Sequence, residues 1–220
     1  MTRSEIASFI AAQTRPGPAT LVPEIRLHLA TEVTPLWQAT EATLAQDGLP
    51  PPYWAFAWPG SQALARHILD HPGIVRGRRV LDFAAGGGIA AIAAARSCAT
   101  VTAAEIDAVA AVAIEMNATR NDVAVTVLAA DLTTRDPADA ARDWDVVLAG
   151  DVFYERPMAE RVGAWLRGLA RHGATVLVAD PGRAYLPTAG LAELARYVVP
   201  TSRDLEDREM RETRVYQMTE

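Results

Sequence analysis

The segment 80–88, VLDFAAGGG, combines a short apolar run, a carboxylate near its end and three consecutive glycines. The apolar residues suit a buried strand, and the glycines let the backbone turn sharply and approach a ligand that a Cβ would keep away. The alanine-rich run 89–96 is typical of a helix whose free amide groups would face that ligand. This predicts a nucleotide-binding turn, although Gly86, Gly88 and Ala91 also fit a dinucleotide fingerprint, and a purely structural turn is compatible with the same residues.

Acidic residues follow four predicted strands of this chain. Asp82 precedes the glycine turn, Glu105 ends a strand at 100–105, and Asp131 and Asp151 follow the strands 124–128 and 145–148. The carboxyl ends of parallel strands meet at one edge of a sheet, where ligands bind. Four carboxylates would repel a pyrophosphate but suit a cationic cofactor such as S-adenosylmethionine, whose sulfonium, ammonium and ribose hydroxyl groups interact favourably with acids.

Strands and helices alternate from residue 79 onward, which predicts a parallel α/β sheet with helices on both faces. The expected helices span residues 59–69, 88–97, 108–120 and 155–171, and a further strand spans 174–179. After Asp180 we expect a helix near 188–195 and two late strands, 197–201 and 213–218, which would form an antiparallel hairpin at the edge of the sheet.

The part before this sheet has a weaker pattern. A helix is expected at 4–13, and Ile25, Leu27 and Leu29 alternate with polar residues as in a half-exposed strand. We divide the chain into an N-terminal extension, 1–52, and a domain that contains the predicted sheet, 53–220. Among the aromatic residues that open the second part, Tyr53 and Trp54 suit a hydrophobic plug, whereas Trp58, just before a helix, is a candidate for contact with the cofactor.

Composition excludes several classes of function. The net charge of −6 argues against a nucleic-acid surface, and no apolar run approaches the length of a membrane span. The single cysteine, Cys98, suggests a small buried thiol and a reducing, cytoplasmic location. The four histidines lack metal-ligand spacing, so no metal is expected. The chain contains no lysine at all.

The glycine turn and the acids after the strands resemble the class I S-adenosylmethionine-dependent methyltransferases, which have a Rossmann-like sheet of seven strands. Asp82, Gly86 and Gly88 match the first motif of that class, but Ala84 stands where it usually has glycine. By this resemblance Glu105 would bind the ribose and Asp131 with Leu132 would border the adenine. Ile106 and Gly150 would also contact S-adenosylmethionine, which would leave as S-adenosylhomocysteine. Without the resemblance, Asp107 suits a helix cap and Asp131 a loop acid.

Three segments, 51–66, 144–157 and 178–183, carry the motifs WPG, GDVFY and DPGR. They resemble the electron transfer flavoprotein β subunit lysine methyltransferase family. The resemblance implies a protein substrate, the β subunit of that flavoprotein, methylated on lysine. It also implies that Asp151, Phe153 and Tyr154 stand where the lysine enters, with Asp151 orienting the ammonium group and the two aromatic rings walling the channel.

Other functions remain open at this point. The same fold could act on another protein, such as a ribosomal protein, or on a small molecule. A nicotinamide-dependent oxidoreductase would need a tyrosine–lysine pair or a second domain, and this chain has neither. A binding module without catalysis is also compatible with the sequence, and Asp151 could instead cap the helix that follows it.

Overall fold

The computed structural model describes residues 1–31, 36, 51–202 and 206–219. Its main sheet has the order β5-β4-β3-β6-β7-β9-β8. The five strands from β5 to β7 are parallel, and β9 and β8 continue the sheet antiparallel. The strands are β3 (Arg79–Phe83), β4 (Thr100–Glu105), β5 (Thr126–Ala129), β6 (Val146–Gly150), β7 (Thr175–Asp180), β8 (Leu191–Pro200) and β9 (Met210–Met218). The expected seven-stranded α/β sheet with a C-terminal antiparallel hairpin is thus confirmed.

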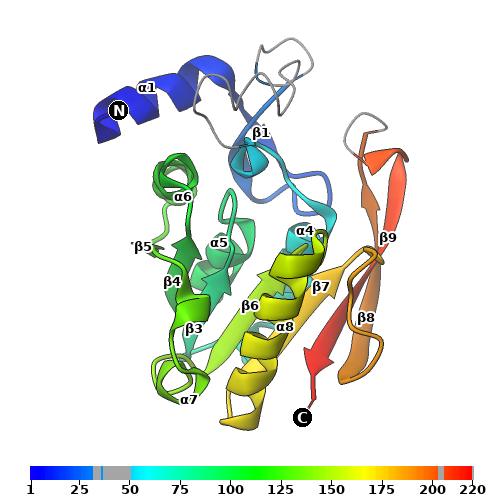
Figure 1. The fold of residues 1–220 in the computed structure, drawn as a ribbon. Coiled ribbons are helices and arrows are strands. Elements are labelled where there is room, and N and C mark those ends of the chain that lie inside the picture. Colours follow the sequence, from blue (N-terminus) through cyan, green and yellow to red (C-terminus); the bar gives the residue numbers. More distant parts are fainter. Residues whose placement is uncertain (32–35, 37–50, 203–205, 220) are drawn as a thin grey trace.

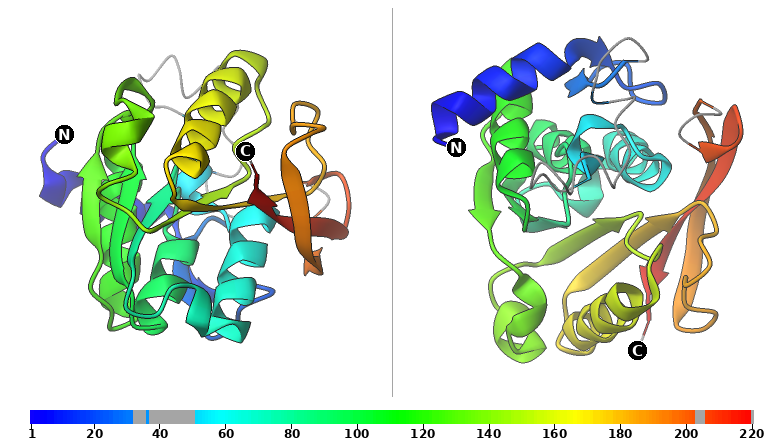
Figure 2. Two further views of the ribbon diagram at one scale, coloured as in Figure 1. Left: turned by 90° about the horizontal axis from the view of Figure 1, so that it is seen from below. Right: turned by 45° about the horizontal axis from the view of Figure 1, so that its top comes forward.

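Helices cover both faces of this sheet, as Figures 1 and 2 show. One face carries α4 (Pro59–Asp70), α5 (Ile89–Arg96) and α6 (Ala108–Arg120), and the other carries α7 (Pro137–Ala140) and α8 (Arg156–Arg171). Alternating side chains of each strand enter two separate cores: Val80 packs with α4 and α5, whereas Leu81 and Phe83 pack with α8. This alternation fixes which strand residues turn toward each helical layer.

The N-terminal part lies against α6. Helix α1 (Arg3–Gln13) packs on it through Ile6 and Ile10, and β1 (Arg15–Pro18) pairs antiparallel with β2 (Arg26–Leu29). Asn117 of α6 and Asn121, the residue that caps its C-terminus, accept hydrogen bonds from the backbone of β2, at 2.8 and 3.0 Å. The rest of the predicted extension, residues 32–35 and 37–50, lies outside the described residues.

Three expectations about local structure are wrong. The helix expected near 188–195 is the first half of β8, because pairing with β9 along nine register positions outweighs the helix propensity of its alanine, leucine and glutamate residues. Strand β1 was not predicted from the sequence, because its two prolines weaken the pattern of a strand. Cys98 is exposed rather than buried, and it lies in the turn that follows α5, with φ +64°.

No helix among the described residues is long and apolar enough to cross a membrane.

Candidate active site

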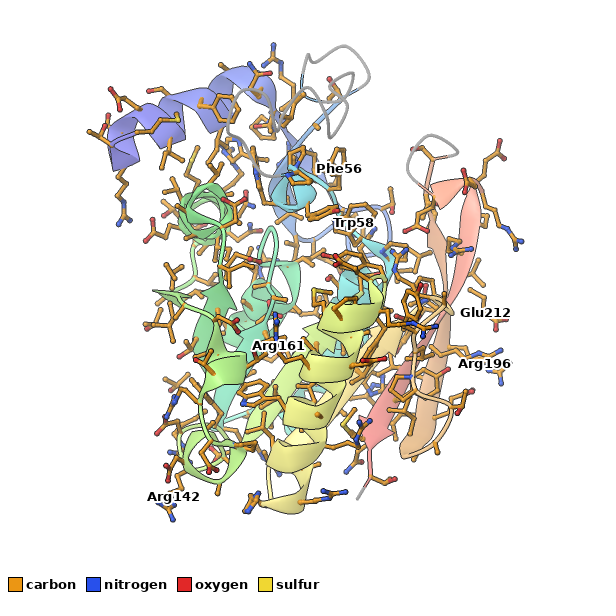
Figure 3. The ribbon with its side chains drawn as sticks, in the orientation of Figure 1. Phe56, Trp58, Arg142, Arg161, Arg196 and Glu212 are labelled. Carbon is orange, nitrogen blue, oxygen red and sulfur yellow. The ribbon has the colours of Figure 1, made fainter. Side chains whose placement is uncertain are left out.

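A cavity of about 1080 Å³ opens at the carboxyl ends of β3, β4 and β6. It contacts loops from both halves of the sheet and the first residues of α1, α6 and α8. Most of the predicted site residues line it: Trp58, Ala84, Gly86, Glu105, Ile106, Asp131, Gly150, Asp151 and Tyr154. In Figure 3 the labelled Phe56 and Trp58 lie at this end of the sheet, while Arg142 lies at the opposite end.

The turn after β3 has three residues in the left-handed region. Ala84 and Gly86 both have φ +52°, and Gly88 has φ +79°. A methyl group is strained in this region, so the turn carries at Ala84 a strain that glycine would not have. Gly88 donates its amide hydrogen to the Ala85 carbonyl at 2.7 Å, and α5 begins at the next residue.

Glu105 ties the end of β4 to this turn. Its Oε2 accepts a hydrogen bond from the Gly86 amide at 3.0 Å, and its Oε1 accepts one from the Ile106 amide at 2.8 Å. Burial raises the pKa of Glu105 above its usual value, and these backbone donors oppose the rise. Oε1 also accepts a longer hydrogen bond from the Asp107 amide, at 3.4 Å. The carboxylate is therefore fixed at the edge of the cavity, where Oε2 still has a lone pair for a ligand hydroxyl group.

Two further acids at this edge act as caps. Asp107 accepts a hydrogen bond from the Val109 amide at the start of α6, so the cap predicted there is confirmed. Asp131 accepts hydrogen bonds from the amide and the hydroxyl of Thr133, and the hydroxyl bond is the main reason that its pKa lies below the usual value. Both carboxylates line the cavity as well as capping a turn.

Asp151 lies in the most constrained part of the site. It has φ +59° and is only 8 % exposed, and its Oδ2 accepts a hydrogen bond from the Ser61 amide at 3.0 Å. Ser61 is in the first turn of α4, so Asp151 caps that helix and not α8, whose N-cap is Glu155. Burial raises the pKa of Asp151 to about 7, with the guanidinium of Arg183 acting against the rise.

Two glycines permit this close approach of α4 to the strand ends. A Cβ on Gly60 would lie 2.4 Å from the Ala179 carbonyl oxygen and 2.6 Å from Asp151 Oδ2. A Cβ on Gly150 would lie 2.7 Å from the Ser61 amide nitrogen. The amino terminus of α4 therefore reaches Asp151 only because both residues lack a side chain.

Aromatic rings line one side of the cavity, next to Asp151. The ring of Tyr53 lies 5.6 Å from that of Tyr154 and 5.9 Å from that of Trp58. Tyr53 and Tyr154 are 40 % and 42 % exposed, whereas Trp54 is buried. Trp54 packs in a core cluster with Ile6 and Ile10, as the predicted plug requires, although it also lines the cavity, and Tyr53 faces the cavity without being buried.

Four predicted site residues do not line the cavity. Asp82 turns toward α5, where its Oδ2 accepts a hydrogen bond from the Ala91 amide at 2.8 Å, because alternate residues of β3 face opposite layers. Gly88 lies behind the turn, where a Cβ would meet Ile114 at 3.1 Å. Leu132 and Phe153 are buried in the core beneath α8, so the channel-wall position expected of Phe153 is wrong.

Several cavity residues were not expected to belong to the site. Arg183 lies in the loop after β7, and its Nη2 is 3.0 Å from Asp151 Oδ1. Arg161 of α8 also lines the cavity, near Asp131, and α1 contributes Ile6. The DPGR motif did mark Arg183 in the sequence, but nothing there indicated that it would reach the end of a neighbouring strand.

Among the described residues, no group of three or more histidine, cysteine, aspartate or glutamate side chains could hold a metal ion. The cavity instead fits S-adenosylmethionine. It offers carboxylates for hydroxyl and ammonium donors, a turn that brings backbone close to the ligand, and apolar surface from Phe83 and Ile106.

Solved structures share this fold. Magnesium protoporphyrin IX methyltransferase from Synechocystis PCC 6803, with bound S-adenosylmethionine, aligns with a TM-score of 0.52 and 14 % identity over 86 % of this chain and all of that one. The same enzyme with bound S-adenosylhomocysteine also gives a TM-score of 0.52, with 18 % identity over 73 % of this chain and 83 % of that one. The fold is that of the class I S-adenosylmethionine-dependent methyltransferases.

Sequence comparison gives the family. A family model described as lysine methyltransferase matches residues 53–186. The electron transfer flavoprotein β subunit lysine methyltransferase of Danio rerio is 37 % identical over 91 % of this chain and 78 % of its own length. The Xenopus laevis protein of the same name is 42 % identical over 80 % of this chain and 70 % of its own length. The chain belongs to the lysine methyltransferase family.

Proposed function

We propose that this protein methylates lysine side chains of the electron transfer flavoprotein β subunit. The substrate is taken from the names of its relatives. The observation that carries the proposal is the buried carboxylate of Asp151, which lies beside exposed aromatic rings at a cavity that fits the cofactor. We propose a protein as the partner, not a nucleic acid or a membrane. We also propose that the protein acts in the cytoplasm.

The roles of the site residues divide between the two ligands. Glu105 would accept hydrogen bonds from the ribose, Asp131 and Ile106 would border the adenine, and Ala84 with Gly86 would contact the amino-acid part. Gly150 and Trp58 would complete the cofactor site from the side of Asp151. Asp82, Gly88 and Leu132 would support these residues from behind, and Phe153 would support Tyr154.

S-adenosylmethionine supplies an electrophilic methyl group on its sulfonium, and the chain must bring a neutral amine to it in line. Such alignment lowers the activation free energy by roughly 7–11 kcal/mol. A free lysine has a pKa near 10.4, so its neutral form at pH 7 costs about 4.6 kcal/mol. Asp151 orients the ammonium group, and its raised pKa of about 7 makes it a better proton acceptor than an exposed aspartate.

Tyr154 lies at the cavity beside Tyr53. Burial, assisted by the neighbouring Tyr53 and Glu155, raises the pKa of Tyr154 to about 12, so its phenol stays neutral at physiological pH. A neutral ring offers its face to the lysine stem and to the cationic methylated products.

Labelled S-adenosylmethionine tests the proposed function directly. The protein is incubated with the cofactor and the purified β subunit, and in parallel with a cell extract, and the labelled residues are identified by mass spectrometry. We expect methyl-lysine in the β subunit, with no contribution from lysines of the enzyme, because the chain has none. Label in small metabolites, in nucleic acid or on another residue type would contradict the proposal.

Replacing Asp151 tests its role. Asp151→Asn tolerates the left-handed backbone and keeps an acceptor for the Ser61 amide, but it removes the charge that orients an ammonium group. We expect kcat/KM to fall at least hundredfold, equivalent to about 2.7 kcal/mol, while the Kd for S-adenosylhomocysteine changes less than threefold. Asp139→Asn, in an exposed ion pair with Arg142, is the control. Equal losses of catalysis and cofactor affinity would show that Asp151 acts on the cofactor instead.

A further inference from the structure

The loop after β7 and the hairpin β8–β9 together place an ionic cluster next to the cavity. Its members are Asp151, Asp180, Arg183, Glu206 and Arg211. All three acids are at most 8 % exposed. Burying this many charges is costly unless they are paired, so their arrangement points to a role beyond packing.

Arg183 is the centre of the cluster. A single nitrogen, Nη2, lies 3.0 Å from Asp151 Oδ1 and 2.7 Å from Glu206 Oε1. Its guanidinium group also stands over the ring of Trp58, 5.7 Å from the centroid. Arg183 thus binds two carboxylates. One is Asp151, which is proposed to orient the substrate lysine, and the other is Glu206, which does not line the cavity.

Glu206 is held in place independently of Arg183. Its amide donates a hydrogen bond to the Ser202 carbonyl at 3.0 Å, and its Oε2 lies 3.2 Å from Arg211 Nε on β9. The carboxylate therefore faces a guanidinium group on each side, one from the site and one from the hairpin.

The charges of the described cluster do not balance. Three carboxylates face two guanidinium groups, so the fully ionised cluster has one negative charge in excess. Asp180 Oδ1 accepts hydrogen bonds from the Gly182 and Arg183 amides, whereas its buried Oδ2 has no hydrogen-bond partner among the described residues, and the same holds for the buried Nε atoms of Arg183 and Arg211. Burial raises the pKa of Asp180 as well as that of Asp151, so either a proton or a cation neutralises this excess charge, and an ammonium group that enters the cluster competes with that proton.

We propose that Glu206 is a positioning residue for the methyl acceptor: it shares Arg183 with Asp151 and keeps the described members of the cluster one cation short, so that the ammonium group of the substrate lysine completes them. Without Glu206, Arg183 would neutralise Asp151 and repel the incoming ammonium. This inference rests on the proposed lysine substrate and adds a residue of the C-terminal hairpin to its recognition.

The test separates KM for the flavoprotein β subunit from kcat and from cofactor binding in the full-length protein. We expect Glu206→Gln to raise that KM at least tenfold, about 1.4 kcal/mol, while the Kd for S-adenosylhomocysteine stays within twofold. Glu193→Gln is the matched control, because Glu193 pairs with Arg196 on the exposed side of the same hairpin, where Figure 3 labels Arg196. This control should leave both constants unchanged.

Arg211→Gln distinguishes charge from structural damage. It removes a cation from the cluster, so KM for the β subunit should fall or stay the same, whereas damage to the hairpin would raise KM in both variants. The inference is overturned if Arg211→Gln raises KM for the β subunit tenfold. It is also overturned if Glu206→Gln has the same KM as Glu193→Gln. The Arg211→Gln measurement decides on its own if the Glu206→Gln protein does not fold. A wild-type enzyme that methylates no lysine refutes the proposed function, and the inference with it.

Discussion

At the scale of single residues, Ala84 and Gly86 have the same φ of +52° in the turn that faces the cofactor cavity. The turn accommodates the methyl group of Ala84, whereas Gly86 has no side chain. A Cβ on Gly86 would meet only the Tyr53 carbonyl oxygen, at 3.9 Å, so the protein opposes it only through the left-handed strain that Ala84 also has. The absence of a side chain at Gly86 is therefore best explained by the space that a ligand needs.

We expect Gly86→Ala to lower affinity for S-adenosylhomocysteine at least tenfold and to cost about 1 kcal/mol of stability through left-handed strain. The reverse change, Ala84→Gly, relieves similar strain but loosens the unfolded chain, so its net effect should stay within about 1 kcal/mol. Its cofactor affinity should not fall. Calorimetric titration and thermal unfolding of both variants provide the measurements, and wild-type affinity in Gly86→Ala would place the ligand elsewhere.

The sequence predicted most of the residues that line the cavity, but it did not predict the ionic cluster around Arg183. Acids that directly follow strands were found because strand ends in a parallel sheet share one edge. Which way a side chain turns from that edge depends on exact strand boundaries, so Asp82 and Phe153 were expected at the cavity and lie elsewhere. Glu206 was missed because it reaches Arg183 only through the hairpin, 23 residues further along the chain, and no local motif encodes that contact.

At the scale of elements, α4 lies unusually close to the ends of β6 and β7. Gly60→Ala would bring a methyl group into contact with the rigid Ala179 carbonyl, so α4 must shift away from Asp151. We expect a loss of about 1–3 kcal/mol in stability and a loss of methyl transfer that persists at temperatures where the variant is fully folded.

Gly73→Ala is the matched control for this prediction. It lies in the short 3-10 helix that follows α4, and a Cβ there would meet no atom within 4 Å. Unfolding curves and activity should match those of the wild type. If Gly60→Ala retained full activity once folded, the position of α4 would not matter for Asp151.

The elements themselves were predicted where local and tertiary signals agree. Strand β4 and helix α6 have the boundaries that were expected, since apolar pattern and capping residues coincide there. The region 188–195 shows the opposite case. Its residues favour a helix, and only pairing with β9, whose partner residues lie 20–27 positions later, makes it a strand.

At the scale of the whole molecule, one site collects residues from distant parts of the chain. The cavity receives Ile6 from α1, the glycine turn from β3, and Asp151 from the centre of the sheet, while the terminal hairpin holds Arg183 from outside. Gathering acids at one edge of a sheet buries them, and two of them, Asp82 and Asp151, have pKa values raised to about 7 chiefly by burial.

This burial makes the stability of the whole molecule depend on pH. A carboxyl whose pKa is near 3.8 when unfolded and about 7 when folded binds its proton more tightly in the native state. Its contribution to the free energy of unfolding is therefore largest below pH 4. That contribution is lost as the pH rises toward 7, and the loss is at most about 4 kcal/mol for each group. Asp82→Asn keeps an acceptor for the Ala91 amide but cannot ionise. We expect its Tm to equal that of the wild type near pH 4 and to exceed it increasingly up to pH 8, by several degrees, since about 1 kcal/mol moves Tm by roughly 2–4 °C in a chain of this size.

Asp143→Asn serves as the control for this pH dependence, because its carboxylate lies in a half-exposed ion pair with Arg135 and not in the core. Its Tm difference from the wild type should not grow between pH 4 and pH 8. Asp151 acts in the same direction as Asp82, so Asp82→Asn should reduce the fall in Tm without abolishing it. A constant offset between Asp82→Asn and the wild type across the whole range would mean that Asp82 is already ionised in the folded protein, and that its bond to Ala91 outweighs the cost of burial.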